Sequence, residues 1–197
     1  MRKCKSPKPT RPAPMKVTAG AVIAAPDALT GLFDRRHLDR MLPALLEPAL
    51  RDQEPLAVAM IDLDHIQAIN DLHGRDAGDA LLRSFGELLS KQARTGDIAC
   101  RSGGEEFCLL LPRTDAHTAR RRVNALLSWW RDAEFRFDTG LSKGHAFSAG
   151  IADSFLAPGA PADLLGAAQA CLAEAKRLGC NRVLVFDAEA AGHEGAD

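Results

Sequence analysis

Two acidic segments carry the residue types that could do chemistry in this chain. The segment RSGGEEFCLLLP at positions 101–112 places two glycines and two glutamates before an apolar run. Gly-Gly between two strand-like runs is an ordinary hairpin signal, so this turn alone is equally consistent with a solvated hairpin tip. The segment IDLD at positions 61–64 ends an earlier apolar run. Alternation along a strand puts Asp62 and Asp64 on one side, at the carboxyl end where open sheets carry their sites.

These acids are expected to meet if the hairpin strand lies beside the earlier strand. Asp62, Glu105 and Glu106 would then converge, and three acids without a nearby lysine need a divalent cation to neutralise them. Oxygen ligands favour Mg²⁺, which keeps several waters and takes phosphate oxygens as its remaining ligands. Asp64 directly precedes a helical pattern, so we interpret it as a helix N-cap and Asp62 as the metal ligand.

The periodicity of the chain predicts the elements that position these acids. Asp34 is expected to cap a helix over residues 35–52, in which Pro43 and Pro48 predict a kink or a break. The apolar run from residue 56 is typical of a strand covered on both faces. Two helices over residues 65–73 and 77–93, interrupted at residues 74–78, follow it. The other expected elements are strands at 97–101 and 107–111, a helix at 116–130, a strand at 146–152, a helix at 161–178 and a strand at 182–187. This order predicts an α/β fold (α+β) with one central mixed β-sheet flanked by helices, in which a β-hairpin carries the active-site turn.

Length and charge limit the domain organisation and the class of partner. A chain of 197 residues with 46% hydrophobic residues fits one domain, and 25 basic against 26 acidic residues argue against a nucleic-acid binder. Residues 1–26 hold six basic residues, five prolines and no acid, so we expect a flexible, basic, Pro-rich tail there. The domain is expected over residues 27–187, and a second flexible tail over residues 188–197.

The cellular compartment is expected to be the cytoplasm. The N-terminal segment lacks the apolar stretch of a secretory signal, and no apolar run approaches the length of a membrane span. Five cysteines, an odd number without CxxC or Cys/His metal spacing, are expected to be reduced and mostly buried.

Several motifs together resemble, in order and spacing, those of the GGDEF domain family, with GGEEF in place of GGDEF. They are DALTGL at 27–32 with Arg35, IDLD at 61–64, IND at 69–71, GD at 78–79, RSGGEEF at 101–107, SAG at 148–150, AK at 175–176 and GCNR at 179–182. The resemblance spans roughly residues 27–187 and implies a nucleotidyl-cyclase-like fold. It also implies a diguanylate cyclase, in which two domains each hold one GTP and each 3′-hydroxyl attacks the other's α-phosphate to give cyclic di-GMP.

The resemblance implies catalytic roles for the acidic residues and the turn. Asp62 and Glu105 hold Mg²⁺ or Mn²⁺, the carbonyl of Leu63 adds a ligand, and Glu106 is either a further ligand or helps to deprotonate the hydroxyl. Such metal-assisted positioning carries most of phosphoryl-type transfer. Gly103-Gly104 lets the backbone approach the nucleotide, where a β-carbon would collide.

The resemblance also implies a nucleotide site, from which two expected cations are missing. Asn70 and Asp79 match the residues that recognise guanine, although a turn Asn and a helix N-cap Asp are the alternatives. Lys176 matches a lysine that grips the triphosphate, but Gln67 and Cys180 stand where the family usually has a second lysine and an arginine. The family's Gly-His is Gly-Arg at positions 74–75, which would restore some positive charge.

The segment from Arg94 to Asp97 matches the family's RxxD inhibitory site, which binds the product. An arginine can form a forked contact with guanine O6 and N7, and the aspartate can accept from guanine N–H groups or orient the arginine. A solvated salt bridge in a loop is the alternative. A further arginine of the family has no certain match, because Ala125 occupies its position and Arg121 and Arg122 lie nearby.

Two functions remain open on these residues. Charged hydrogen bonds contribute about 1.5–3 kcal/mol each, so the loss of two cations would cost on the order of 10²- to 10⁴-fold in binding or rate. One function is a diguanylate cyclase, of full or reduced activity, that works as a homodimer and is inhibited at its RxxD site. The other is a catalytically degenerate GGDEF module that binds GTP or cyclic di-GMP and signals through a partner protein. The Pro-rich segment cannot form a coiled coil, so pairing must come from the domain, from bound product, or from a separate sensor or effector protein.

Overall fold

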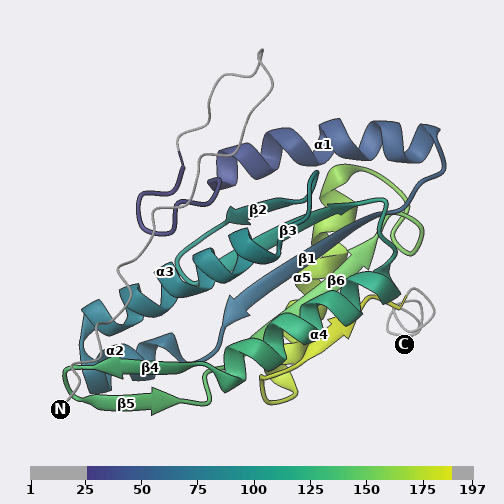
Figure 1. Ribbon diagram of the computed structural model, residues 1–197. Coiled ribbons are helices and arrows are strands. Elements are labelled where there is room, and N and C mark those ends of the chain that lie inside the picture. Colours follow the sequence, from purple (N-terminus) through teal and green to yellow (C-terminus); the bar gives the residue numbers. More distant parts are fainter. Residues whose placement is uncertain (1–25, 188–197) are drawn as a thin grey trace.

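The computed structural model describes residues 26–187 (Figure 1). Apart from Pro26, the tails expected at residues 1–26 and 188–197 lie outside the described residues. The helices are α1 (Arg35–Arg51), α2 (Ile66–His73), α3 (Arg75–Gln92), α4 (Ala116–Asp132) and α5 (Pro161–Arg177). The strands are β1 (Leu56–Leu63), β2 (Ile98–Arg101), β3 (Glu106–Pro112), β4 (Glu134–Phe137), β5 (Gly140–Lys143), β6 (Phe147–Asp153) and β7 (Val183–Val185). Within this part of the chain, no helix is long and apolar enough to cross a membrane.

A five-stranded sheet in the order β2-β3-β1-β6-β7 forms the centre of the fold. β1 pairs antiparallel with β3 and with β6, β2 pairs antiparallel with β3, and β6 pairs parallel with β7. The mixed sheet flanked by helices is therefore confirmed, as is the antiparallel hairpin β2-β3. Every residue of β1 is buried, which agrees with its nearly continuous apolar sequence.

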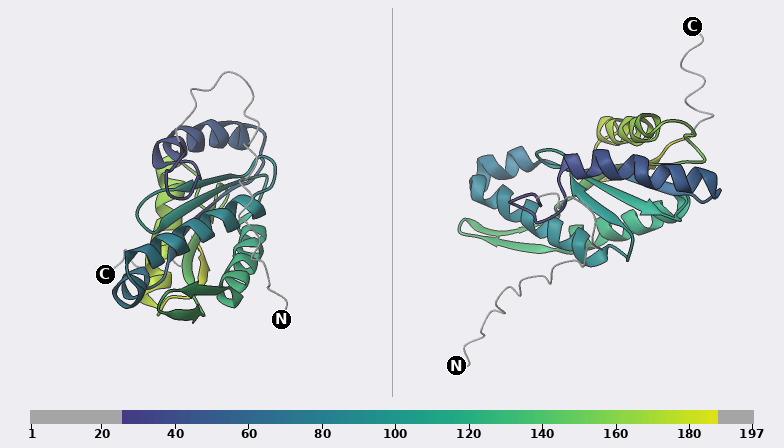
Figure 2. Two further views of the ribbon diagram at one scale, coloured as in Figure 1. Left: turned by 60° about the vertical axis from the view of Figure 1, so that its left-hand side comes forward. Right: turned by 90° about the horizontal axis from the view of Figure 1, so that it is seen from above.

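Two apolar cores lie on opposite faces of this sheet (Figure 2). Alternate side chains of β1 divide between them, since Val58 packs with leucines of α1 and α5 while Ala59 packs with α3 and α4. Trp130 packs into the core on the α3 and α4 side and is 3% exposed, whereas Trp129 is 50% exposed. At Gly150 the backbone of α5 comes so close to β6 that a β-carbon would lie 2.1 Å from the Ala168 carbonyl oxygen.

Of the kink or break expected at Pro43 and Pro48, the break does not occur. α1 runs without interruption through Pro43 and Pro48, and the Asp34 carboxylate caps it by accepting from the His37 N–H. Proline removes the hydrogen bond to the carbonyl four residues earlier. Those carbonyls belong to Asp39 and Ala44, which are exposed, so water can take the place of the lost bonds.

The interruption between the two helices after β1 is shorter than the expected one at residues 74–78. Only Gly74, with a φ of 86°, separates α2 from α3, and Gly78 and Asp79 lie inside α3. Asp79 is therefore not a helix N-cap, and Asn70 lies in α2 rather than in a turn.

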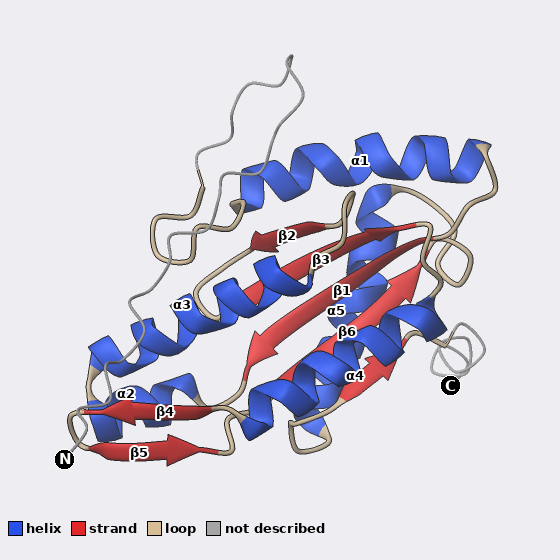
Figure 3. Cartoon of the chain, in the orientation of Figure 1, coloured by secondary structure: helices blue, strands red, loops and turns tan. Residues whose placement is uncertain are grey.

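The hairpin β4-β5 was not expected from the sequence (Figure 3). It is short, and its outer face is largely exposed, so its alternation of apolar and polar residues covers only a few positions. Phe135 and Phe137 anchor it against the α3 and α4 core, and the His73 ring of α2 lies 5.1 Å from the Phe137 ring. The hairpin therefore covers the α2 end of the molecule, close to the predicted site.

Candidate nucleotide and metal site

The acidic turn and the end of β1 lie side by side, as the sequence predicts. Asp62 is the direct cross-strand partner of Glu106, and the Leu63 N–H donates to the Glu105 carbonyl over 3.2 Å. The Ser102 N–H closes the hairpin by donating to the Glu106 carbonyl at 2.9 Å. β1 ends and β3 begins at this point, so Asp62, Glu105 and Glu106 lie at one corner of the sheet.

Asp62 is the buried centre of this acidic corner. Asp62 is 3% exposed, and its Oδ2 lies 2.7 Å from the Lys176 ammonium, so the expectation that these acids have no lysine nearby is wrong. Its Oδ1 has no hydrogen-bond partner among residues 26–187. Burial raises the pKa of Asp62 to about 6, the Lys176 ion pair opposes this, and the charges of Glu105 and Glu106 add to the rise. An orphaned buried carboxylate oxygen beside two further acids is the environment that a divalent cation would relieve.

The residues present fit magnesium only with help from a ligand. In the stretch from Pro26 to Asp187, no three His, Cys, Asp or Glu side chains are grouped closely enough to hold a metal ion. Mg²⁺ in nucleotide enzymes commonly uses one or two carboxylates and completes its shell with waters and phosphates. Asp62, Glu105 and the Leu63 carbonyl match that smaller donor set, and their role stays a prediction.

The two glycines of the turn differ in their surroundings. A β-carbon at Gly103 would lie 3.1 Å from Glu106 Oε2, whereas one at Gly104 would meet nothing within 4 Å. Gly103 therefore makes room for the Glu106 carboxylate, while Gly104 leaves the outer surface of the turn open.

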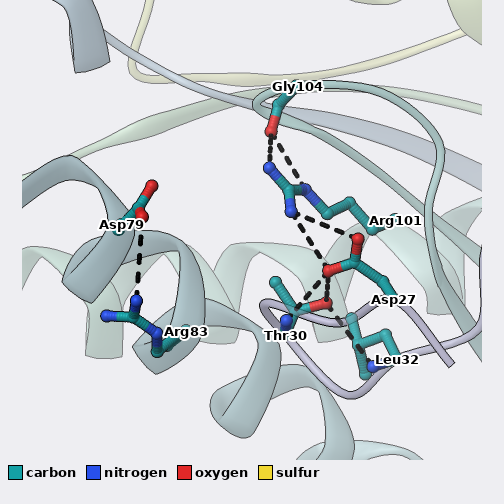
Figure 4. A network of polar contacts seen from close by, with 7 residues as sticks. All are labelled: Asp27, Thr30, Leu32, Asp79, Arg83, Arg101 and Gly104. Carbon is teal, nitrogen blue, oxygen red and sulfur yellow. Dashed lines mark hydrogen bonds and ion pairs between the residues drawn. The ribbon is translucent and has the colours of Figure 1, made fainter. Parts of the chain in front are cut away.

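Arg101 holds the turn to the segment before α1, a role that the sequence reasoning missed. Its Nε and Nη2 donate to the Gly104 carbonyl at 3.0 and 2.6 Å, and its Nη1 donates to Asp27 Oδ1 at 3.1 Å (Figure 4). Although burial acts to raise the pKa of Asp27, hydrogen bonds from Thr30 and Arg101 outweigh it, so the pKa lies below its usual value. The sequence did hold a signal for this contact, because Asp27 belongs to the DALTGL motif and Arg101 to the RSGGEEF motif.

The interpretation of Asp64 as a helix cap is wrong. The N-cap position of α2 is His65, with a φ of 62° and no side-chain capping bond. Asp64 is 8% exposed and instead accepts hydrogen bonds from the Ser148 hydroxyl at 2.8 Å and the Asn181 N–H at 2.9 Å. Both donors come from distant parts of the sequence, so local periodicity could not reveal them.

Asn70 and Asp79 lie on two adjacent helices. The Oδ1 of Asn70 is buried without a hydrogen-bond partner, and a β-carbon at Gly78 would lie 2.1 Å from it. Gly78 therefore lets the Asn70 side chain press against α3, one residue before Asp79. Asp79 is 46% exposed and makes only a long ion pair with Arg83, at 3.7 Å (Figure 4). The Asn70 amide oxygen and the Asp79 carboxylate are acceptors that suit the N1–H and N2–H groups on the Watson–Crick edge of guanine.

Gln67 and the two arginines near Cys180 make contacts with other residues. The Gln67 amide donates to Asp71 at 2.8 Å, and Arg177 forms a bidentate pair with Glu174. Arg182 donates to the Cys180 carbonyl at 3.0 Å. Among the triphosphate-binding residues implied by the resemblance, only Lys176 reaches the acidic corner.

Arg75 lines a hollow of about 380 Å³ between the start of α3 and the β4-β5 hairpin, and His73 and Arg136 are among the other lining residues.

The RxxD residues border a cavity of about 200 Å³ between α3, β3 and α4. Asp97 accepts from the Arg94 N–H at 2.7 Å and from Arg122 Nη2 at 2.5 Å, while Arg122 Nη1 is buried without a partner. Trp129 forms part of the wall, and the small side chain of Ala125 leaves the space open. The structure thus places Arg122 beside Asp97, which the sequence had left undecided between two arginines.

Comparisons with known proteins identify the family of this chain. A family model described as "Diguanylate cyclase, GGDEF domain" matches residues 24–182. The response regulator PleD of Caulobacter vibrioides is 32% identical over 82% of this chain, and the diguanylate cyclase DgcP of Pseudomonas aeruginosa is 35% identical over 82%. The matches cover only 36% and 24% of those two proteins, so the chain spans about a third of their length or less.

One solved structure is similar to this chain over nearly the whole length of the solved chain. The active GGEEF domain of a diguanylate cyclase from Vibrio cholerae superposes with a TM-score of 0.72 at 28% identity. The match covers 78% of this chain and 96% of that one.

Proposed function

Because this chain belongs to the GGDEF domain family, we propose that it is a diguanylate cyclase that condenses two GTP molecules into cyclic di-GMP. The observation that carries the proposal is a pair of buried acceptor oxygens, Asp62 Oδ1 and Asn70 Oδ1, neither of which has a hydrogen-bond partner within residues 26–187. One suits a cation and the other suits a guanine N–H group. The domain that performs the reaction extends over residues 27–187, and it acts in the cytoplasm.

The acidic corner is the proposed metal site. Asp62, Glu105 and the Leu63 carbonyl would hold Mg²⁺ or Mn²⁺, with Glu106 as a further ligand or as the group that takes up the proton. When bound, the metal neutralises charge on the phosphates and orients them. The raised pKa of Asp62 supports this role, because the carboxylate is poorly stabilised as an anion without a cation.

The protein's own residues bind and orient the nucleotide. Asn70 and Asp79 recognise guanine, Lys176 meets the triphosphate, and the open Gly104 lets the backbone approach. In the reaction the 3′-hydroxyl oxygen of one GTP bonds to the α-phosphorus of the other, and the bond to the β-phosphate oxygen breaks. Pyrophosphate leaves, and the hydroxyl proton passes to Glu106 or to water. Two such steps, one in each direction across a homodimer, close the ring.

The cavity beside Asp97 is the proposed product-inhibition site. Arg94 and Arg122 supply two guanidinium groups, and Asp97 orients the second. The partnerless Nη1 of Arg122 is free to donate to guanine O6 or N7. Trp129, half exposed at the wall, offers a face on which a base can stack.

A second function is favoured by one specific observation. Gln67 and Cys180 remove two positive charges, and Gln67 is engaged with Asp71 instead. A module with intact guanine recognition but weak phosphate binding would act as a receptor for GTP or cyclic di-GMP and would signal through a separate sensor or effector protein.

The two functions are separated by product analysis with a matched variant. Purified protein is incubated with GTP and Mg²⁺ or Mn²⁺, beside Glu105→Gln and beside a sample with chelator, and the nucleotides are resolved by chromatography. The cyclase proposal expects cyclic di-GMP and pyrophosphate in a 1:2 ratio from the unmodified protein only. Equal product from Glu105→Gln would refute the role of Glu105, while nucleotide binding without product would favour the receptor.

A further inference from the structure

Three motif residues without a role in the proposed reaction meet at the Asp64 carboxylate. Asp64 belongs to the IDLD segment, Ser148 to the SAG segment and Asn181 to the GCNR segment. The Asp64 carboxylate accepts from the Ser148 hydroxyl with Oδ1 at 2.8 Å and from the Asn181 N–H with Oδ2 at 2.9 Å. Asp64 therefore connects the end of β1 to β6 and to the turn between α5 and β7.

The turn that Asp64 holds is conformationally costly. Gly179, Cys180 and Asn181 have φ values of 102°, 61° and 52°. A positive φ suits glycine but is unfavourable for a cysteine and is tolerated by an asparagine. Residues held in sparsely populated conformations persist only when their surroundings determine them, and they gather at functional sites.

The same turn ends α5 in a fixed geometry. The Gly179 N–H donates to the Lys176 carbonyl at 3.0 Å, and the Cys180 N–H donates to the Ala175 carbonyl at 3.2 Å. This pair of bonds is the Schellman pattern of a helix C-terminus. It uses both N–H groups internally, so the first N–H beyond the pattern, that of Asn181, is the one that ties the helix end to Asp64.

Lys176 lies in the last turn of α5 and depends on this connection. Its ammonium lies 2.7 Å from Asp62, so the two aspartates of the IDLD segment hold the same helix end in different ways. Asp62 binds a side chain that is needed at the phosphates when nucleotide enters. Asp64 binds a backbone N–H that stays in place whichever partner Lys176 has.

We propose that Asp64 is a positioning residue for nucleotide binding, which acts by holding the 179–181 turn so that Lys176 reaches the triphosphate. The proposal rests on the proposed nucleotide site and deepens it. Asp64 itself touches neither Asp62 nor the predicted guanine residues through any hydrogen bond recorded in residues 26–187.

A double-mutant cycle on nucleotide affinity tests this. The protein, Asp64→Asn, Lys176→Met and the double variant are titrated with Mg²⁺ and the α,β-methylene analogue of GTP, which binds without turnover. Asp64→Asn removes the negative charge and replaces one of the two acceptor oxygens by an NH2 donor, so it cannot accept from the Ser148 hydroxyl and the Asn181 N–H through separate oxygens. We therefore expect about tenfold weaker nucleotide binding when Lys176 is present, on the scale of one charged hydrogen bond. In the Lys176→Met background we expect less than a twofold effect, because residues that act through one another are not additive.

Two further variants keep the test decisive. Asp163 accepts from the Ala160 N–H at 2.8 Å at the other end of α5, so Asp163→Asn should lower the melting temperature without changing nucleotide affinity. If Asp64→Asn does not fold, Ser148→Ala removes one donor to the same carboxylate and should weaken binding about two- to threefold. Equal losses in both backgrounds, or an unchanged affinity in Asp64→Asn, would overturn the proposal. An unmodified protein that fails to bind the analogue would instead reject the proposed function.

Discussion

Gly78→Ala should damage guanine recognition without damaging the fold. The added β-carbon would lie 2.1 Å from Asn70 Oδ1 and 2.9 Å from its Cγ, so the Asn70 side chain must swing away from α3. A neutral hydrogen bond contributes about 0.5–1.5 kcal/mol, so GTP affinity should fall about 2- to 13-fold. ATP affinity should stay the same, because the Asn70 acceptor is proposed to bind the N–H edge that adenine lacks.

The stability of the same variant should move little or upward. Gly78 lies inside α3, and alanine stabilises a helix interior by about 1 kcal/mol relative to glycine. This gain in helix stability offsets the free-energy cost of moving the Asn70 side chain. Gly166→Ala is the matched control, because Gly166 lies inside α5 with nothing within 4 Å of its missing β-carbon. It should raise the free energy of unfolding by a similar amount and leave nucleotide affinity unchanged.

The assay is a titration of the α,β-methylene analogues of GTP and ATP with Mg²⁺, together with thermal unfolding of each variant. Asn70→Ala provides the second half of a cycle, since Gly78→Ala should cost no further GTP affinity once the Asn70 side chain is gone. A Gly78→Ala protein that is stable and still prefers GTP over ATP as the parent does would refute the placement of guanine beside Asn70.

Three other outcomes are expected. Gly150→Ala should lower the free energy of unfolding by about 3 kcal/mol, measured by denaturant titration. The new β-carbon would lie 2.1 and 2.2 Å from backbone atoms of α5, which cannot move aside as a side chain can. A loss below about 1 kcal/mol would show that α5 can shift. Arg122→Ala should weaken cyclic di-GMP binding about tenfold or more in calorimetry, on the scale of one charged hydrogen bond, and leave binding of the GTP analogue unchanged; parallel losses would show that the cavity is not a separate site. The pKa of Asp62 is raised to about 6 from 3.8, so the folded protein holds a proton there between about pH 4 and 6 that the unfolded chain does not. The stability from this group is therefore present below pH 3.8 and lost as pH rises through about 6, and Mg²⁺ affinity should rise over the same window; a Mg²⁺ affinity that is flat from pH 5 to 7 would contradict the role of Asp62.

The sequence predicted most of the sheet because its strands carry strong local signals. The buried run of β1, the Gly-Gly turn and the helical repeat of α3 each depend on periodicity within a few residues. The meeting of Asp62 and Glu106 followed from two such signals and one assumption, that the hairpin pairs with β1. The hairpin β4-β5 was missed because strands of four residues leave little alternation to detect.

The errors arose where a long-range contact outweighs a local preference. Asp64 has the type and place of a helix cap, but Ser148 and Asn181, 84 and 117 residues away, supply its hydrogen bonds. Pro43 should interrupt a helix, but its exposed position lets water satisfy the carbonyl that it leaves free. The partner of Asp97 depended on which of two adjacent arginines faces α3, which only the packing of α4 decides.

The most direct test of the central claim is the amount of cyclic di-GMP that the purified protein forms from GTP and Mg²⁺ as its own concentration is raised. We expect cyclic di-GMP as the product, with a rate per molecule that increases with protein concentration because two protomers must meet. A protein that binds GTP at high concentration and forms no cyclic di-GMP would contradict it.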